Sequence, residues 1–388
     1  MSVFSAIVLA TGMWRATLSL PGGELPFNFE LKKINDSYII EIINSQEKIS
    51  VNEIAFKDDS LFANLPVFDS EIKVKISQNE MKGEWINYSR KENKSIPFNA
   101  EAGIKYRFFE SRENPVTNVS GRWEVKFSPG TKDSSFAIGI FNQDKDHVTG
   151  TFLTTTGDYR FLDGMIVKDS LYLSCFDGAH AFLFKTKVEG SKMKGIYLSG
   201  NHWQEDWVAE RNEKIELPNP DSLTFLKSGF DKIKFSFPDT DSNFVALSDK
   251  KFQNKVIVIQ IMGSWCPNCM DESIFLSDYY KKNNSKGIEF IGISFEKTND
   301  FKKAVSNVNR VKERLGIPYT LLLAGNRENA NSALPMLNKI MGYPTTIFID
   351  KKGAVRKIYT GFTGPATGKY YERYKDDFDR FITMLLSE

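Results

Sequence analysis

Two cysteines separated by two residues, Cys266 and Cys269, stand directly after the most apolar run of the C-terminal third, Val256-Ile-Val-Ile-Gln-Ile261. An unbroken apolar run of this length is typical of a strand that is buried on both faces. Pro267 suits the first turn of a helix, because its missing N–H is one that a helix start leaves unpaired anyway. The sequence therefore predicts a buried strand followed by a helix that begins at the cysteine pair and ends near Lys282.

The place of Cys266 at a helix N-terminus predicts a reactive sulfur. Unpaired N–H groups and the positive end of the helix dipole favour a thiolate and lower a thiol pKa from its free value of about 8.5. We therefore expect Cys266 to be the nucleophile. Cys269 lies on the same helix face, where it can attack a mixed disulfide on Cys266 and release the product. Zinc would need two further ligands, and the sequence offers no second cysteine pair.

After the cysteine motif, apolar runs alternate with amphipathic segments. The predicted elements are a strand at Ile288–Ile293, a helix near Asp300–Arg314, a strand at Tyr319–Leu323, a helical stretch near Ala333–Met341, a hairpin of Thr345–Ile349 with Ala354–Tyr359, and a helix at Tyr370–Leu386. Strand–helix units that end in a hairpin and a helix predict a mixed sheet covered on both faces. We expect an α/β domain over residues 235–388.

The first ~215 residues alternate apolar and polar residues in short runs, which is typical of antiparallel β structure. The pattern repeats, because Gly12-Met-Trp14 matches Gly121-Arg-Trp123, and Met81-Lys-Gly83-Glu-Trp85 matches Met193-Lys-Gly195-Ile-Tyr197. The offset of roughly 110 residues predicts an internal duplication in an all-β region. We expect two modules, residues 1–110 and 111–215, each a barrel or a sandwich, or else one double-length module. The tryptophans of this region are expected to be core or barrel-closing residues: Trp14, Trp85, Trp123, Trp203 and Trp207.

A boundary is predicted between the β region and the α/β domain. Pro218 and Pro220 stand close together in a stretch without periodicity, and proline disrupts a strand ladder. We expect residues 216–234 to be a linker, so the chain is predicted to be multidomain.

Composition excludes some classes of function. The chain carries 51 Lys and Arg against 49 Asp and Glu, and the basic residues form no stripe that could neutralise phosphates, so nucleic acid is not an expected partner. Three cysteines in 388 residues cannot be a disulfide scaffold. Cys175, in a strand-like run, is expected to be a small buried hydrophobic residue.

The N-terminus begins with the short apolar run Ser2–Ala10. This run is too short to span a bilayer, and no Lys or Arg precedes it. It is either the end of an export signal, with a possible membrane tether, or an ordinary first strand.

The motif Met262-Gly-Ser-Trp265-Cys-Pro-Asn-Cys269-Met-Asp-Glu272 resembles the TlpA/ResA-like thiol-disulfide oxidoreductases of the thioredoxin superfamily. The resemblance covers about residues 235–388 and implies a thioredoxin fold. Trp265 matches the aromatic residue before the first cysteine, and Gly342-Tyr343-Pro344 matches the loop of a cis-proline that faces the cysteines. It implies that Trp265, Tyr343 and Pro344 contact substrate.

The resemblance also assigns a proton acceptor. Thioredoxin has a buried aspartate where this chain has Gln260, whereas Glu272 matches a glutamate that ResA-like proteins keep in the active site. A buried carboxylate there could take the proton of Cys269, although an exposed helix glutamate is the alternative. One departure is Asn268, because most relatives have proline before the second cysteine.

The family implies an extracytoplasmic oxidoreductase in the periplasm or cell envelope. Such an enzyme would reduce disulfides in exported proteins, be recharged by a membrane electron donor, and need no cofactor or metal beyond the Cys266–Cys269 disulfide. Two alternatives remain open. The β region could be a binding module or docking platform with an ancillary redox domain, or the protein could be a peroxiredoxin-type peroxidase. The latter would need threonine three residues before its reactive cysteine, where Gly263 stands.

Overall fold

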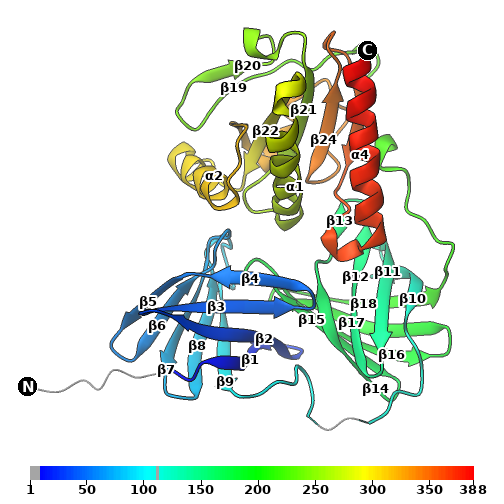
Figure 1. Cartoon of the computed structure of the whole chain (residues 1–388). Coiled ribbons are helices and arrows are strands. Elements are labelled where there is room, and N and C mark those ends of the chain that lie inside the picture. Colours follow the sequence, from blue (N-terminus) through cyan, green and yellow to red (C-terminus); the bar gives the residue numbers. More distant parts are fainter. Residues whose placement is uncertain (1–8, 111–112) are drawn as a thin grey trace, which may run out of the picture. The chain divides into compact units, whose positions relative to one another are not determined.

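The computed structural model describes residues 9–110 and 113–388, and the chain divides into two compact units (Figure 1). The first unit comprises Met1–Phe152 and Tyr159–Ile215, and the second comprises Leu153–Asp158 and Glu216–Glu388. Most of the predicted Ser2–Ala10 run lies outside the described residues. Within the described ranges, no helix has both the length and the apolar character needed to cross a membrane.

The first unit contains two nine-stranded antiparallel sheets, except that residues 153–158 of the second sheet group with the second unit. These sheets confirm the predicted all-β region. The strands of the first sheet are β1 (Gly12–Leu20), β2 (Gly23–Ile34), β3 (Ser37–Asn44), β4 (Glu47–Val51), β5 (Glu53–Lys57), β6 (Ser60–Asn64), β7 (Ser70–Ile76), β8 (Glu80–Asn87) and β9 (Ser95–Ala102). Their order is β4-β3-β2-β1-β9-β8-β7-β6-β5. The first and last strands therefore pair, and β4 and β5 form the two edges.

The second sheet repeats this plan. Its strands are β10 (Gly121–Phe127), β11 (Ser135–Asp144), β12 (His147–Thr154), β13 (Gly157–Asp158), β14 (Leu162–Val167), β15 (Ser170–Phe176), β16 (Ala181–Glu189), β17 (Lys192–Ser199) and β18 (Trp203–Arg211). The order is β11-β10-β18-β17-β16-β15-β14-β12-β13, with a further pairing of β11 and β12. That pairing closes the sheet on itself, so it is barrel-like.

Equivalent residues of the two sheets play the same structural part, which confirms the duplication. Trp14 and Trp123 are fully buried, and each indole N–H donates to the carbonyl four residues earlier, at 2.8 Å and 2.9 Å. Gly83 and Gly195 are also equivalent. A Cβ at either one would lie 2.1 Å or 2.4 Å from a carbonyl oxygen of the neighbouring strand, so the chains approach closely only because both residues are glycine.

The two sheets share a core. Phe27 of β2 stacks on Phe176 of β15 with ring centroids 4.4 Å apart, and Cys175 beside it is fully buried, as predicted. The core prediction was wrong for Trp203, which is 48% exposed. Trp203 is the first residue of β18, beyond the buried part of the sheet, and its N–H bonds the Glu205 carboxylate.

The second unit has a thioredoxin-like α/β fold. Its elements are β19 (Ser236–Pro238), β20 (Phe244–Ala246), β21 (Val256–Met262), α1 (Pro267–Asn283), β22 (Ile288–Glu296), α2 (Phe301–Leu315), β23 (Thr320–Asn326), α3 (Ala330–Ala333), β24 (Thr345–Ile349), β25 (Val355–Thr360) and α4 (Lys369–Ser387). The central sheet has the order β23-β22-β21-β24-β25, with β21, β22 and β23 parallel and β24 and β25 antiparallel.

Helices α1 and α4 pack on the same face of this sheet. The ring of Phe378 on α4 lies 5.0 Å from Phe275 on α1 and 5.4 Å from Phe348 on β24. This packing fixes the two helices against β24, beside the start of α1 where the cysteines stand.

Two segments differ from their predictions. Residues 216–234, predicted as a linker, group with the second unit, because Leu226 bridges to Leu337 and Ile233 is buried in the core. The helix predicted near Ala333–Met341 is absent, and only α3 is helical there. Pro335 supplies no N–H to a helix, and the apolar residues after α3 are buried against the sheet as irregular chain instead.

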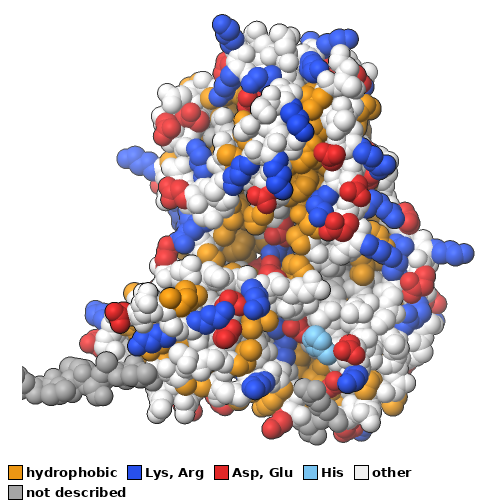
Figure 2. Space-filling view, viewed as in Figure 1, with side chains coloured by type: hydrophobic (Ala, Val, Ile, Leu, Met, Phe, Trp, Pro, Cys, Tyr) orange, Lys and Arg blue, Asp and Glu red, His pale blue; other side chains and the backbone are white. Residues whose placement is uncertain are grey.

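Acidic and basic side chains are interspersed on the visible faces of both units (Figure 2). This mixture agrees with the balanced composition of the chain.

Candidate active site

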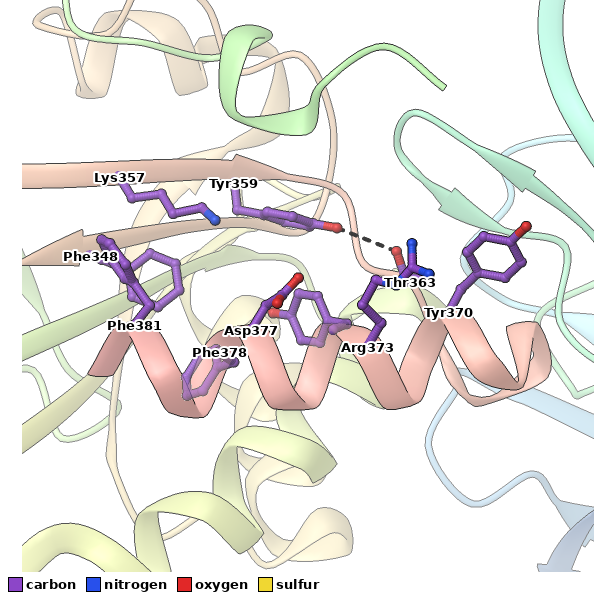
Figure 3. Close-up of a pocket in the computed structure, with 10 residues that line it drawn as sticks. Phe348, Lys357, Tyr359, Thr363, Tyr370, Arg373, Asp377, Phe378 and Phe381 are labelled. Atoms are coloured by element: carbon purple, nitrogen blue, oxygen red, sulfur yellow. Dashed lines mark hydrogen bonds between the residues drawn. The ribbon is translucent and has the colours of Figure 1, made fainter. Parts of the chain in front are cut away.

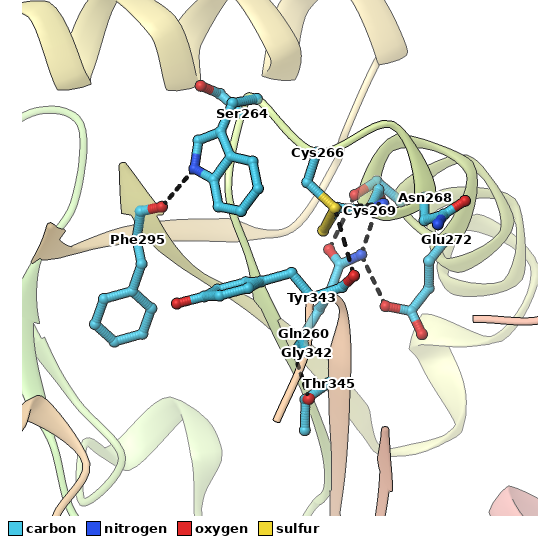
Figure 4. The surroundings of a disulfide bond; sticks show 12 residues. Gln260, Ser264, Cys266, Asn268, Cys269, Glu272, Phe295, Gly342, Tyr343 and Thr345 are labelled. Carbon is cyan, nitrogen blue, oxygen red and sulfur yellow. Dashed lines mark hydrogen bonds between the residues drawn. A yellow bond between two sulfur atoms is a disulfide. The ribbon is translucent and has the colours of Figure 1, made fainter. Parts of the chain in front are cut away.

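The cysteine pair stands at the predicted helix start (Figure 4). Cys266 caps α1 with an extended backbone, φ −107° and ψ 107°, and its sulfur accepts the backbone N–H of Cys269 at 3.2 Å. The two sulfurs form a disulfide with Cα atoms 5.2 Å apart. Cys266 is 6% exposed and Cys269 is fully buried, so an incoming group reaches the first sulfur before the second.

The loop between β21 and α1 is held by hydrogen bonds to β22. The backbone N–H and the hydroxyl of Ser264 donate to the buried carboxylate of Glu296 at 2.9 Å and 2.6 Å, and the Trp265 indole N–H donates to the Phe295 carbonyl at 2.9 Å. A Cβ on Gly263 would lie 2.3 Å from the Trp265 indole nitrogen. The loop therefore places Trp265 beside the cysteines only because residue 263 has no side chain.

The loop before β24 faces the sulfur pair, as the resemblance implies. The Tyr343–Pro344 peptide bond is cis, and the Tyr343 carbonyl oxygen lies 3.6 Å from the Cys266 sulfur. The Tyr343 ring packs edge-on against Trp265 with centroids 5.3 Å apart. Three residues expected to contact substrate are thus gathered around the more accessible sulfur.

Glu272 is a fully buried carboxylate in the same site, which contradicts the alternative of an exposed helix glutamate. One of its oxygens accepts from the Thr346 hydroxyl at 2.6 Å and the Tyr374 hydroxyl at 3.2 Å, and the other accepts from the Gln260 amide at 2.9 Å. Burial raises the pKa of Glu272 to about 7, while these three hydrogen bonds act in the opposite direction. The group is therefore able to exchange a proton near neutral pH.

Gln260 connects this carboxylate with the second cysteine. Its amide also donates to the Cys269 carbonyl at 3.1 Å, and its own carbonyl accepts from the Ser273 hydroxyl at 2.9 Å. Gln260 cannot take a proton itself, but every polar atom of its side chain is bonded. It fixes Glu272 and the first turn of α1 relative to each other.

Sequence reasoning missed Thr346 and Tyr374 and saw Gln260 only as a replaced aspartate. Thr346 stands two residues after the cis-proline, which is a local signal that could have found it. Tyr374 is on α4, and the sequence offers no local signal for its contact with a helix that starts about 100 residues earlier.

A separate pocket of about 160 Å³ lies between β25 and α4 (Figure 3). Its lining includes Lys357, Asp377 and the ring of Tyr374, whose hydroxyl reaches Glu272. The cysteines do not line it, so it adds nothing to the chemistry of the sulfurs.

The raised pKa of Glu272 predicts a pH-dependent stability. Burial favours the neutral acid, so the folded protein binds more protons at this site than the unfolded chain between about 4.5 and about 7. The stabilising contribution is complete below about 4.5 and is lost as pH rises through about 7. We expect the wild type to lose about 3 kcal/mol of unfolding free energy relative to Glu272→Gln across this window.

Urea unfolding of the oxidised proteins at a series of pH values measures this difference. Subtraction of the variant removes the contribution of all other titrating groups. A wild-type minus variant difference that does not change with pH would contradict the assignment.

Comparison with known proteins agrees with this geometry. A family model described as Redoxin matches residues 230–372. The thiol-disulfide oxidoreductase ResA of Bacillus subtilis is 28% identical over 138 residues, which cover 35% of this chain and 69% of that protein. The thiol:disulfide interchange protein DsbE of Escherichia coli is 24% identical over 159 residues, 41% of this chain and 78% of that protein.

Peroxiredoxin Q of Suaeda salsa is 28% identical over 155 residues, which cover 39% of this chain and 65% of that protein. The Redoxin match includes the cysteine pair, Glu272 and the cis-proline loop. The C-terminal part of this chain therefore matches the Redoxin model and is similar there to the thiol-disulfide oxidoreductases ResA and DsbE.

Proposed function

We propose that this protein is an extracytoplasmic reductase of protein disulfides that works through the Cys266–Cys269 pair. The observation that carries the proposal is the arrangement of Cys266 at the start of α1, opposite the cis-proline loop, with the buried Glu272 one turn after Cys269. Nucleophile, resolving thiol and proton acceptor then follow one another along a single helix.

The reaction begins with the reduced protein. The Cys266 thiolate attacks one sulfur of a client disulfide, a mixed disulfide forms, and the second client sulfur leaves as a thiolate that takes a proton from water. Glu272 then accepts the proton of Cys269, and the Cys269 sulfur attacks Cys266. The mixed disulfide breaks, the client leaves fully reduced, and its two electrons have come from the pair, which is now a disulfide.

Exported proteins with disulfides are the clients in this proposal, and a membrane electron donor returns the pair to the dithiol. Support comes from the similarity to ResA and DsbE, which are named for thiol-disulfide chemistry. The sulfur pair itself carries the electrons, so the proposed cycle uses no further cofactor.

The peroxidase alternative draws on the similarity to peroxiredoxin Q. A threonine at position 263 would clash with the Trp265 indole, which favours the disulfide reductase. Insulin reduction by the full chain, compared with its consumption of hydrogen peroxide, separates the two. Rapid peroxide consumption without insulin reduction would overturn the proposal, and loss of both activities would favour a binding module.

Cys269→Ser is expected to stop the cycle at the mixed disulfide, because the variant keeps the nucleophile and lacks the group that displaces it. Clients should then stay covalently bound to Cys266 and separate from it on reduction. Non-reducing gels followed by mass spectrometry detect such complexes. The matched control is Cys266→Ser with Cys269 intact, and complexes that form equally in both variants would show that the attachment does not depend on Cys266.

A further inference from the structure

A short segment of this chain already occupies the surface beside the sulfur pair. Leu153–Asp158 groups with the second unit and is the tight hairpin between β12 and β13, in which Leu153 pairs with Asp158 and Thr154 with Gly157. The Thr154 hydroxyl also donates to the Gly157 carbonyl at 2.9 Å. Gly157 and Asp158 are buried. We call residues 155–158 the cover segment.

Hydrogen bonds connect the cover segment to the site. The side-chain amide of Asn268, between the two cysteines, donates to the Asp158 carbonyl at 3.3 Å, and the Gly364 N–H donates to the Asp158 carboxylate at 2.9 Å. Asn268 is the residue that replaces the family's proline. Proline has no side-chain donor, so this departure from the family pattern creates one of the contacts.

Glycines make the remaining contacts possible. A Cβ on Gly342, next to the cis-proline loop, would lie 2.5 Å from the Thr156 methyl group, and one on Gly361 would lie 2.8 Å from the Thr155 carbonyl oxygen. A Cβ on Gly157 would lie 2.1 Å from the Asn268 amide nitrogen, and its φ of +147° already favours glycine. The backbones of the cover segment and of the site therefore approach each other closely because glycines stand on both sides of the contact.

We propose that Asn268, Gly342, Gly361 and Gly364 form a shelf that binds an extended segment of the client, and that the cover segment occupies this shelf until a client displaces it. This inference rests on the proposed function. The shelf offers N–H donors from Asn268 and Gly364, and the close approach at Gly342 and Gly361 leaves no room for a large side chain of the bound segment. It fits an extended client strand with a small residue followed by an acidic one, as in Gly157-Asp158. Net of the hydrogen bonds to water, each of these bonds contributes little, so a client that makes equivalent bonds can replace the segment.

The test measures access to Cys266 directly. In reduced Cys269→Ser protein, Cys266 is labelled with a polyethylene glycol maleimide and, separately, with iodoacetamide. Adding Gly157→Ala forces a methyl group against the Asn268 amide, and we expect about tenfold faster labelling by the bulky reagent and little change with the small one. Asp158→Ala, which removes the acceptor for Gly364, should act in the same direction.

Gly12→Ala is the matched control. Gly12 also has a positive φ, +105°, but a Cβ there meets nothing within 4 Å, so the substitution imposes a similar backbone strain away from the site. Circular dichroism establishes that each variant is folded. Unchanged maleimide labelling in both cover variants would overturn the proposal.

A second measurement tests the shelf itself. A synthetic peptide of residues 153–158 should slow the bulky labelling of the Gly157→Ala variant by occupying the vacated shelf, and absence of any slowing would overturn the shelf. In insulin reduction, the cover variants should lower KM severalfold at similar kcat. If insulin is not reduced at all, the proposed function fails while the labelling result still decides whether the segment covers Cys266.

Discussion

Cys266→Ser is expected to abolish disulfide reduction, with a fall in kcat/KM of more than about a thousandfold. A serine hydroxyl stays protonated at neutral pH and is a far weaker nucleophile than a thiolate. The hydroxyl can still accept the Cys269 N–H that the Cys266 sulfur accepts at 3.2 Å, so the start of α1 should persist. Insulin reduction with dithiothreitol as electron source measures the effect.

The control for this loss is Cys175→Ser, which removes the third cysteine, in the core of the first unit. Its thermal unfolding is followed alongside, because a hydroxyl in an apolar core destabilises the fold. Activity that survives in Cys266→Ser but not in Cys175→Ser would place the nucleophile elsewhere.

Glu272→Gln is expected to slow resolution of the mixed disulfide by about a hundredfold, the ordinary contribution of a positioned general base. Only the ionised carboxylate can accept the Cys269 proton, so the wild-type rate should rise with pH through the Glu272 pKa of about 7. The variant has no group that titrates there, and its rate should lack that step. Single-turnover reduction of a labelled client at a series of pH values records both effects.

Two further variants, one on α1 and one on α4, make this test more specific. Asp278→Asn removes an exposed carboxylate of α1 and should leave the rate and its pH profile unchanged. Tyr374→Phe removes a hydrogen bond that lowers the pKa of Glu272, so its profile should move to higher pH. An unchanged pH profile in Glu272→Gln would show that another group accepts the proton.

The local parts of the site could be predicted from sequence. The apolar run, the proline and the cysteine spacing define a strand and a helix start within about fifteen residues, and α1 begins at Pro267 as expected. The burial of Glu272 depends instead on Thr346 and Tyr374, which are 74 and 102 residues away along the chain. Such contacts are set by the packing of α1, β24 and α4, and local periodicity carries no information about them.

In the β region, too, some features could be predicted from the sequence and others could not. Self-similarity around Trp14 and Trp123 predicted the duplication, because equivalent residues make equivalent bonds. Short strands are harder to predict, because β5 is mostly exposed and β13 is only two residues long, so neither leaves a clear alternation in the sequence. The helix predicted near Ala333–Met341 is absent for a related reason. The apolar residues of this stretch are buried as irregular chain, and their spacing resembles that of a helix.

The complete burial of Cys269 also bears on how the protein withstands oxidants. Hypochlorite or peroxide would first meet Cys266 and convert it to a sulfenic acid, and the neighbouring thiol can condense with that group to regenerate the ordinary disulfide. Irreversible sulfinic acid would then accumulate only where this condensation fails. The buried Cys269 is therefore expected to reverse the first oxidation step of the more accessible Cys266.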